Sequence, residues 1–158
     1  MDKEKYIALK EVSVGYDGVS VLKNISFDLF SGELICLLGA NGKGKSTLLK
    51  TLMGILPGLS GEILLKGKAL SAFSAEEKAK EMAVVLTDSL RDVTMKAKDV
   101  VATGRYPYLS WNAKFKQEDE AIIEASLSKV GALEYAGRWM SGLSDGERQR
   151  VILARALA

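Results

Sequence analysis

A glycine-rich segment that ends in Lys-Ser-Thr constrains this chain more than any other feature. Gly39 is followed by four residues and then by Gly44-Lys45-Ser46. Glycines let the backbone turn tightly and direct successive N–H groups around an anion. The apolar run 33–38 before the segment predicts a buried strand, and residues 45–53 after it predict a helix. A phosphate-binding loop requires this strand–loop–helix context.

Each part of this loop has an expected role. Lys45 is expected to reach the β and γ phosphates of a nucleotide, and the Ser46 hydroxyl is expected to bind Mg²⁺. The loop also ends at a helix N-terminus, which favours an anion. The alternative is a glycine-rich turn that matches the pattern by chance, and the flanking strand and helix argue against it. The predicted phosphate-binding residues are Gly39, Ala40, Asn41, Gly42, Lys43, Gly44, Lys45, Ser46 and Thr47.

Bulk properties narrow the class of protein. The chain has 158 residues, which suits one domain with a core, and its net charge of +2 is too near balance to indicate a nucleic-acid partner. Its start is charged, and no apolar run has the length of a signal peptide or a membrane span. We therefore expect a cytoplasmic protein whose membrane role, if it has one, comes through a partner. The single cysteine, Cys36, lies in the expected buried strand, so we predict that it packs in the core.

The remaining pattern predicts strands on both sides of the loop and helices after them. Residues 6–16 and 21–29 are β-like, with Ile25, Phe27 and Leu29 on one face, and 62–65 forms another strand. Residues 15–18 and 66–68 predict turns. Ser74 to Glu77 predicts a capping box that opens a short helix. Further predictions are a buried strand over 82–86, a helix capped by Thr94, an irregular segment over 104–112, and a helix over 117–130 with Ile122, Ile123, Leu127 and Val130 on one side.

A second informative stretch is Leu143-Ser144-Asp145-Gly146-Glu147, which is followed by Arg-Gln-Arg. Ser144 and Glu147 have the spacing of a capping box, which predicts a helix through Ala158. A capping box alone does not explain Gly146 in the first turn, because glycine weakens helices. A glycine there fits the close approach of backbone to an anion.

Together, the two stretches resemble the phosphate loop and the signature sequence of the ATP-binding-cassette ATPases. Tyr16 stands where that family places the aromatic residue that stacks on adenine, although a tyrosine on a strand surface is the alternative. The resemblance implies an α/β phosphate-loop NTPase core with an antiparallel β-subdomain and a helical subdomain. In one incomplete domain, 1–158, we expect the β-subdomain over 1–30 and 60–72, the nucleotide-binding core over 31–58 and 73–87, the helical subdomain over 88–142, and the signature with its helix over 143–158.

Within that family, Gly104-Arg105-Tyr106-Pro107-Tyr108 followed by Glu118-Asp119 looks like the importers of iron-siderophores, haem and cobalamin. The resemblance implies that two subunits, expected to form a homodimer, enclose two Mg-ATP molecules. Leu143, Ser144, Asp145, Gly146 and Glu147 would then face the ATP of the partner subunit, with Ser144 and Gly146 on the γ-phosphate. Membrane-spanning permease subunits would hold the ATPase on the inner face of the cell membrane, and a substrate-capture protein would act indirectly. No nucleic-acid partner is expected.

Three departures from the family pattern qualify these expectations. The family's Mg²⁺-contacting glutamine should fall near Thr87, where the sequence has Thr87-Asp88; these residues are either metal or water ligands or a plain strand-end turn. Asp145 and Glu147 replace a glycine and a glutamine of the signature. A carboxylate near a γ-phosphate is unfavourable unless it points away or faces a helix N-terminus.

The third departure is the absence of the family's magnesium-binding aspartate, water-activating glutamate and switch histidine, because the sequence stops at Ala158 inside an amphipathic pattern. We therefore expect a C-terminally truncated chain that does not hydrolyse ATP alone, with no catalytic residue inside it. The missing neighbour strand should leave apolar surface exposed on Leu34, Cys36 and Leu38. Alternatives are a nucleotide-binding fragment without hydrolysis and a soluble cassette ATPase outside transport. A kinase or GTPase would not need residues 143–150.

Overall fold

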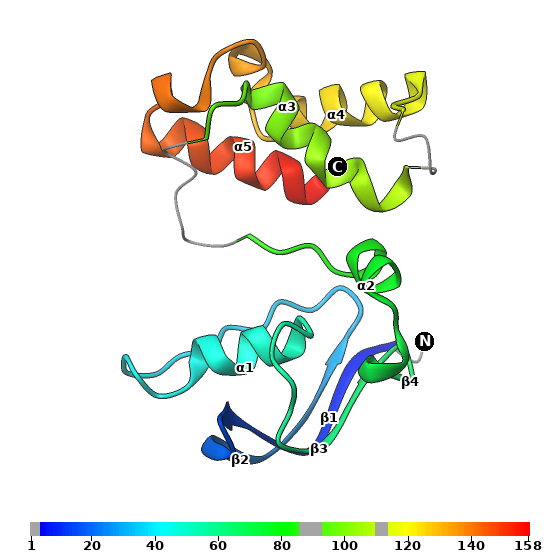
Figure 1. Cartoon of the computed structure of the whole chain (residues 1–158), viewed down its shortest axis with the longest axis vertical. Coiled ribbons are helices and arrows are strands. Elements are labelled where there is room, and N and C mark those ends of the chain that lie inside the picture. The colour runs from blue at the N-terminus through cyan, green and yellow to red at the C-terminus, as the bar shows by residue number, and fades with distance from the viewer. Residues whose placement is uncertain (1–3, 86–92, 110–113) are drawn as a thin grey trace. The chain divides into compact units, whose positions relative to one another are not determined.

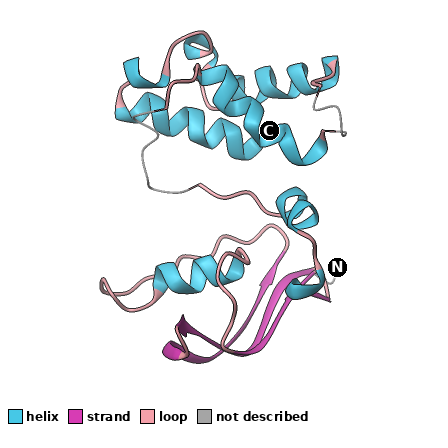
Figure 2. Cartoon of the chain, viewed as in Figure 1, coloured by secondary structure: helices cyan, strands magenta, loops and turns pink. Residues whose placement is uncertain are grey.

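A computed structural model describes residues 4–85, 93–109 and 114–158 (Figure 1). These residues form two compact units, Met1–Lys78 and Ala79–Ala158. All of the described strands lie in the first unit, whereas the second is built from helices and turns (Figure 2). Each unit has its own buried apolar cluster.

The first unit is organised by an antiparallel sheet in the order β2-β1-β3-β4. The strands are β1 (Lys5–Tyr16), β2 (Val19–Phe30), β3 (Ser60–Leu65) and β4 (Lys68–Ala69). In β2 the alternation predicted from the sequence is confirmed, because Ile25, Phe27 and Leu29 are more buried than Ser26 and Asp28 between them. Antiparallel strands therefore stand before and after the glycine-rich loop, as predicted.

Two tight turns set the register of this sheet. Asp17 and Gly18 join β1 to β2, and both have positive φ, 49° and 78°. Lys66 and Gly67 join β3 to β4 with φ of 49° and 78°. Two-residue hairpins of this kind require positive φ at both central positions because only then does the turn match the twist of the strands. The predicted turns at 15–18 and 66–68 are confirmed.

Helix α1 (Lys45–Leu52) covers part of the sheet and follows the glycine-rich loop directly. Leu48 packs against Leu9, Val12 and Val14 of β1, which form the core of this unit. After β4 come a 3-10 turn, η1 (Leu70–Ala72), and the short helix α2 (Ala75–Glu81). The predicted capping box is present, because Ser74 N donates to Glu77 Oε2 at 2.6 Å and Glu77 N donates to Ser74 Oγ at 3.1 Å.

The second unit packs three α-helices around one core. They are α3 (Ala97–Ala102), α4 (Gln117–Lys129) and α5 (Asp145–Leu157), with 3-10 turns η2 (Thr103–Tyr108), η3 (Leu133–Tyr135) and η4 (Met140–Gly142) between them. The buried cluster contains Ala97, Val100, Val101, Ile123, Leu127, Ala132, Met140, Leu143, Val151 and Ala154. The helices predicted over 117–130 and from Ser144 onward are confirmed.

The predicted buried strand over 33–38 is wrong. The segment forms no strand, and Leu34 and Leu38 are 91% and 88% exposed. A strand forms through hydrogen bonds to a neighbour, and none of the described strands pairs with this segment. Cys36 is exposed, so its predicted place in a core is also wrong. The expected exposure of Leu34, Cys36 and Leu38 is confirmed.

Three smaller predictions also need correction. Residues 82–85 form no strand, for the same lack of a described neighbour, and residue 86 lies outside the described residues. Thr94 does not cap α3; the N-cap is Lys96, and the N–H groups of Ala97 and Lys98 donate to the carbonyls of residues 138 and 136. In α4, Ile123 is buried but Ile122 is 36% exposed, because adjacent helical residues cannot share one face.

Candidate functional site

The glycine-rich loop is held open by backbone conformations that favour glycine. Gly39, Gly42 and Gly44 have φ of 152°, 77° and 82°. Gly44 is the N-cap of α1. A Cβ atom on Gly44 would lie 2.8 Å from Val21 Cγ1 of β2, so a side chain there is excluded by space as well as by φ. The end of the loop therefore lies against β2.

Lys45 curls back over this loop. Its Nζ donates to the carbonyl oxygens of Gly39 and Ala40 at 2.6 and 2.8 Å. The ammonium group thus sits at the mouth of the loop, where a phosphate would meet both a positive charge and the N-terminus of α1. Ser46 is exposed beside it, whereas Thr47 is buried against the sheet. The first turn of α1 carries no acidic residue that would oppose an anion.

Tyr16 lies close to the loop at the end of β1. Thr47 Oγ1 donates to the Tyr16 hydroxyl at 3.5 Å, and the Tyr16 side chain is 46% exposed. The sheet and loop together line an open pocket of about 290 Å³. It is lined by Tyr16, Val21, Asn41, Gly42, Gly44, Lys45, Ser46 and Thr47. The structure therefore brings Tyr16 and most of the predicted phosphate-binding residues to one pocket.

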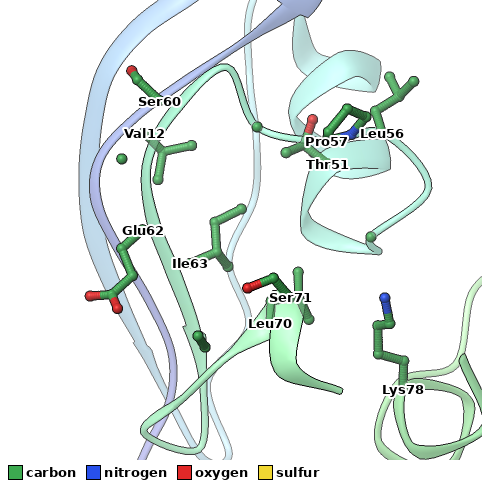
Figure 3. A pocket seen from close by; sticks show the side chains of 14 residues that line it. Val12, Thr51, Leu56, Pro57, Ser60, Glu62, Ile63, Leu70, Ser71 and Lys78 are labelled. Atoms are coloured by element: carbon green, nitrogen blue, oxygen red, sulfur yellow. The ribbon is translucent and has the colours of Figure 1, made fainter. Parts of the chain in front are cut away.

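The first unit also has a second pocket, of about 400 Å³, between β3, η1 and the end of α1 (Figure 3). Lys78 extends toward the turn after α1, and its Nζ lies 3.2 Å from the position that a Cβ of Gly54 would take. A cation beside the C-terminal end of a helix stabilises its unpaired carbonyl groups. Thr51 in the same wall already donates to Thr47 O at 3.0 Å. Lys78 and Thr51 therefore have structural roles at the end of α1. None of the residues 39–47 lines this pocket.

The second group of predicted site residues, 143–147, leads into helix α5 and forms the start of its first turn. Ser144 is the N-cap, and its predicted capping box with Glu147 is confirmed. Glu147 Oε2 accepts from Ser144 N at 2.6 Å and from Ser144 Oγ at 2.7 Å. These backbone and hydroxyl donors, with the nearby Arg138 guanidinium, hold the pKa of Glu147 below its ordinary value. Gly146 stands in open space, with no atom within 4 Å of the position of an added Cβ.

Two arginines clamp this turn. Arg138 Nη1 donates to Glu147 Oε1 at 3.0 Å, and its Nη2 donates to Gly142 O at 2.9 Å. Arg148 pairs with Asp145 Oδ1 at 2.6 Å and also donates to the carbonyls of Met140 and Leu143. Both carboxylates that depart from the family signature are therefore paired with arginine. One of them, Glu147, also faces the N-terminus of α5. This is one of the two placements in which a carboxylate near a γ-phosphate was expected to be tolerated.

The functional roles of all the predicted site residues stay predictions, and for two of these residues the structure gives no position either. Thr87 and Asp88 lie outside the described residues, so their expected role as metal or water ligands remains a prediction. Within the ranges that the structure describes, no group of three or more His, Cys, Asp or Glu residues gathers at a place suited to a metal ion. The exposed Ser46 hydroxyl at the start of α1 could serve as a ligand of the Mg²⁺ that accompanies a nucleotide. The other ligands of that Mg²⁺ would be phosphate oxygens and water.

Comparison with known proteins decides the family. The family model described as ABC transporter matches residues 22–158. This chain belongs to the ABC transporter family. It is 42% identical over 139 residues to the hemin import ATP-binding protein HmuV of Pseudomonas fluorescens, covering 88% of this chain and 53% of the relative. It is 34% identical over 152 residues to the iron(3+)-hydroxamate import ATP-binding protein FhuC of Bacillus subtilis, covering 96% of this chain and 56% of the relative.

Solved ABC structures share the fold. The CbiO1 protein of Clostridium perfringens, part of the ABC transporter complex CbiONQ, matches with a TM-score of 0.82 and 26% identity over 98% of this chain and 62% of that one. The chain spans about half the length of the curated relatives named above. None of the helices in its described ranges combines the length and apolar character needed to cross a membrane.

Sequence reasoning missed two residues that shape the candidate site. Val21 lines the pocket beside the glycine-rich loop, but nothing in the alternation of β2 distinguishes it from other exposed residues. Arg138 was missed because no local sequence pattern pairs it with Glu147. The two side chains meet only through the folded path of the chain between them. The signal that could have found Arg138 is chemical, since an acidic residue in a turn that is expected to contact phosphate calls for a nearby cation.

Proposed function

We propose that this chain is the nucleotide-binding part of an ABC ATPase subunit that powers import across a membrane. The observation that carries the proposal is the loop Gly39–Thr47, where the Lys45 ammonium group lies over glycine backbone at the start of a helix. The pocket beside it has an exposed tyrosine suited to a flat base. Phosphates would bind at Lys45 and at the loop N–H groups, and the adenine ring would stack on Tyr16.

The proposed assembly has two such subunits enclosing Mg-ATP, in which the turn Leu143–Glu147 of one subunit contacts the γ-phosphate held by the other. Bound Mg²⁺ would supply charge neutralisation of the phosphates, with Ser46 as its protein ligand and Thr87 as a further candidate. ATP favours the closed pair because its phosphates bridge the two subunits, and hydrolysis by the whole protein removes the bridge. Permease subunits would convert this change into transport and would hold the protein on the cytoplasmic face.

The names of the relatives support a substrate class. HmuV is named for hemin import and FhuC for iron(3+)-hydroxamate import. We therefore propose that the transported molecule is an iron-siderophore, haem or a related large chelate such as cobalamin, delivered by a capture protein. No residue of this chain is proposed to touch that molecule.

Nucleotide binding is tested by titrating the chain with Mg-ATP in a calorimeter. Lys45→Ala should weaken binding by at least about tenfold, because a charge-assisted hydrogen bond to phosphate contributes about 1.5–3 kcal/mol. Lys50→Ala is the matched control, since Lys50 lies exposed at the end of the same helix and should leave affinity unchanged. Equal affinities for wild type and Lys45→Ala would contradict the proposal.

The same samples separate binding from turnover. The alternative function is nucleotide binding without hydrolysis by these 158 residues. Release of inorganic phosphate is then measured after the titration. Binding without release supports that alternative for this chain, whereas steady release that depends on Lys45 would overturn it.

A further inference from the structure

Glu147 places a negative charge in the turn 143–147, called the signature turn below, where the proposed function expects a phosphate to bind. Its carboxylate lies in the first turn of α5, beside the glycine at which a phosphate would arrive. Both of its oxygens are engaged, Oε2 by Ser144 and Oε1 by Arg138. The Arg138 contact is an ion pair of 3.0 Å, with side-chain exposures of 49% for Arg138 and 23% for Glu147.

Arg138 is itself held in place by the surrounding backbone. Its carbonyl accepts from Ala97 N at 2.9 Å, and its own N–H group donates to Tyr135 O at 2.8 Å. Its second guanidinium nitrogen bonds Gly142 O, just before the signature turn. The guanidinium group therefore joins the segment that enters the turn to the helix that leaves it.

The capping box between Ser144 and Glu147 stabilises α5, but folding stability does not explain the ion pair of Glu147 with Arg138. A half-exposed ion pair contributes little to the free energy of folding, because water screens both charges. The position of the ion pair has a larger effect on an anion that approaches the start of α5. The N–H group of Gly146 has no acceptor inside the helix, as for any residue in a first turn, and Gly146 leaves the space around it open. A bare carboxylate at residue 147 would repel an anion that approaches there.

We propose that Arg138 is a positioning residue of the signature turn, whose guanidinium group neutralises Glu147 and holds it beside Ser144, so that a phosphate can reach the Gly146 N–H group. The inference rests on the proposed function, in which this turn contacts the phosphate of a nucleotide. Arg138 acts through Glu147 and does not touch the phosphate itself. In an ABC protein with glutamine at this position, the same arginine would have no charge to neutralise.

The test is an NMR titration of the 158-residue chain with magnesium tripolyphosphate, read from two sets of amide signals. Gly42 and Gly44 report the phosphate loop, and Gly146 reports the signature turn. In Arg138→Gln the affinity read at Gly146 should fall about threefold to fivefold, the effect of one charge near a helix N-terminus. The affinity read at Gly42 and Gly44 should not change.

Three further variants separate charge neutralisation from simple bracing of the turn. Arg138→Lys should restore most of the affinity at Gly146, because it keeps the charge. The double variant Arg138→Gln/Glu147→Gln should also restore it, because the repelling carboxylate is gone. Arg150→Gln is the matched control: it removes an exposed arginine of α5 that bonds Gly131 O, and it should behave as wild type.

The outcomes are distinguishable. Failure of Gly42 and Gly44 to respond in the wild type would count against the proposed function. A normal loop response with no response at Gly146, or with no effect of Arg138→Gln, would overturn the inference alone. Persistent loss in the double variant would also overturn it, because Arg138 would then act only through Gly142. If Arg138→Gln does not fold, Glu147→Gln alone decides: the inference expects affinity at Gly146 equal to or above wild type, and weaker affinity overturns it.

Discussion

Two carboxylates in this protein, those of Asp119 and Glu147, each accept hydrogen bonds from a backbone N–H group and from an arginine side chain. Asp119 of α4 shows this outside the candidate site. Its Oδ1 accepts from Arg105 Nε at 3.0 Å, and its Oδ2 accepts from Lys116 N at 2.9 Å. The Lys116 N–H group first, and the Arg105 guanidinium second, hold the pKa of Asp119 below its ordinary value. Both side chains of the ion pair are nearly buried.

This lowered pKa predicts a pH dependence. Because the folded-state pKa lies below the unfolded one, the contribution of Asp119 to stability is full above the unfolded pKa, about 4, and is lost as pH falls through the folded pKa. Urea unfolding across a pH series should therefore show that Asp119→Asn is less stable than wild type at neutral pH, with the difference shrinking below about pH 4. Asp99→Asn, at an exposed carboxylate of α3, is the control. A difference that does not change with pH would contradict this prediction.

Among the elements, the contact between η2 and α5 depends on one glycine. A Cβ on Gly104 would lie 2.3 Å from the carbonyl oxygen of Arg155 in α5, although the φ of Gly104 is not in the left-handed region. Arg105, the next residue, reaches Asp119 of α4 and stacks over the Tyr108 ring at 4.1 Å. The segment Gly104–Tyr108, which the sequence offered as a mark of one importer subfamily, therefore has a structural role in joining η2 to α4 and α5.

Gly104→Ala should destabilise the second unit by about 1–3 kcal/mol, because the added methyl group forces two backbones apart. Gly137→Ala is the matched control, since a Cβ there meets nothing within 4 Å and its φ is not in the left-handed region. Denaturant unfolding, followed by the loss of helical circular dichroism, measures both. Equal stability for the two variants would show that η2 moves freely over α5.

The sequence predicted these elements unevenly, and hydrogen-bond partners explain the difference. Helices α1, α4 and α5 were predictable because a helix bonds within itself and its caps are local, as at Ser144 and Glu147. The strands of the hairpins were predictable because Asp17-Gly18 encodes the turn that pairs them. The apolar run 33–38 has strand-like composition, but composition supplies no partner strand.

At the scale of the whole molecule, the proposed nucleotide pocket belongs to one unit and the proposed signature turn, residues 143–147, to the other. Tyr16 and residues 39–47 lie within Met1–Lys78, whereas residues 143–147 lie within Ala79–Ala158. Each unit is stabilised by its own core, with Leu9, Val12 and Val14 in the first and Leu127 among those in the second. A cavity in one core should therefore leave a binding pocket in the other unit intact.

Leu127→Ala tests this division. Leu127 is fully buried, so the substitution should cost about 2–5 kcal/mol of folding stability in the second unit. Mg-ATP affinity, measured by calorimetry where the variant is still folded, should remain that of wild type. Leu133→Ala, at a leucine that is 49% exposed, should change stability by less than about 0.5 kcal/mol. Loss of nucleotide affinity in folded Leu127→Ala would show that the pocket depends on the second unit.

The sequence by itself determined the chemistry of the candidate site. The order of glycines before Lys45-Ser46 places N–H groups, an ammonium group and a hydroxyl within a few residues of one another, so their proximity needs no tertiary contact. The capping box at the start of α5 is local for the same reason. Only the tertiary structure decided that Tyr16 and Val21 join the loop in one pocket, and that Arg138 meets Glu147. Those contacts depend on how strands and turns pack, and that packing is a property of the folded chain and not of any short segment of it.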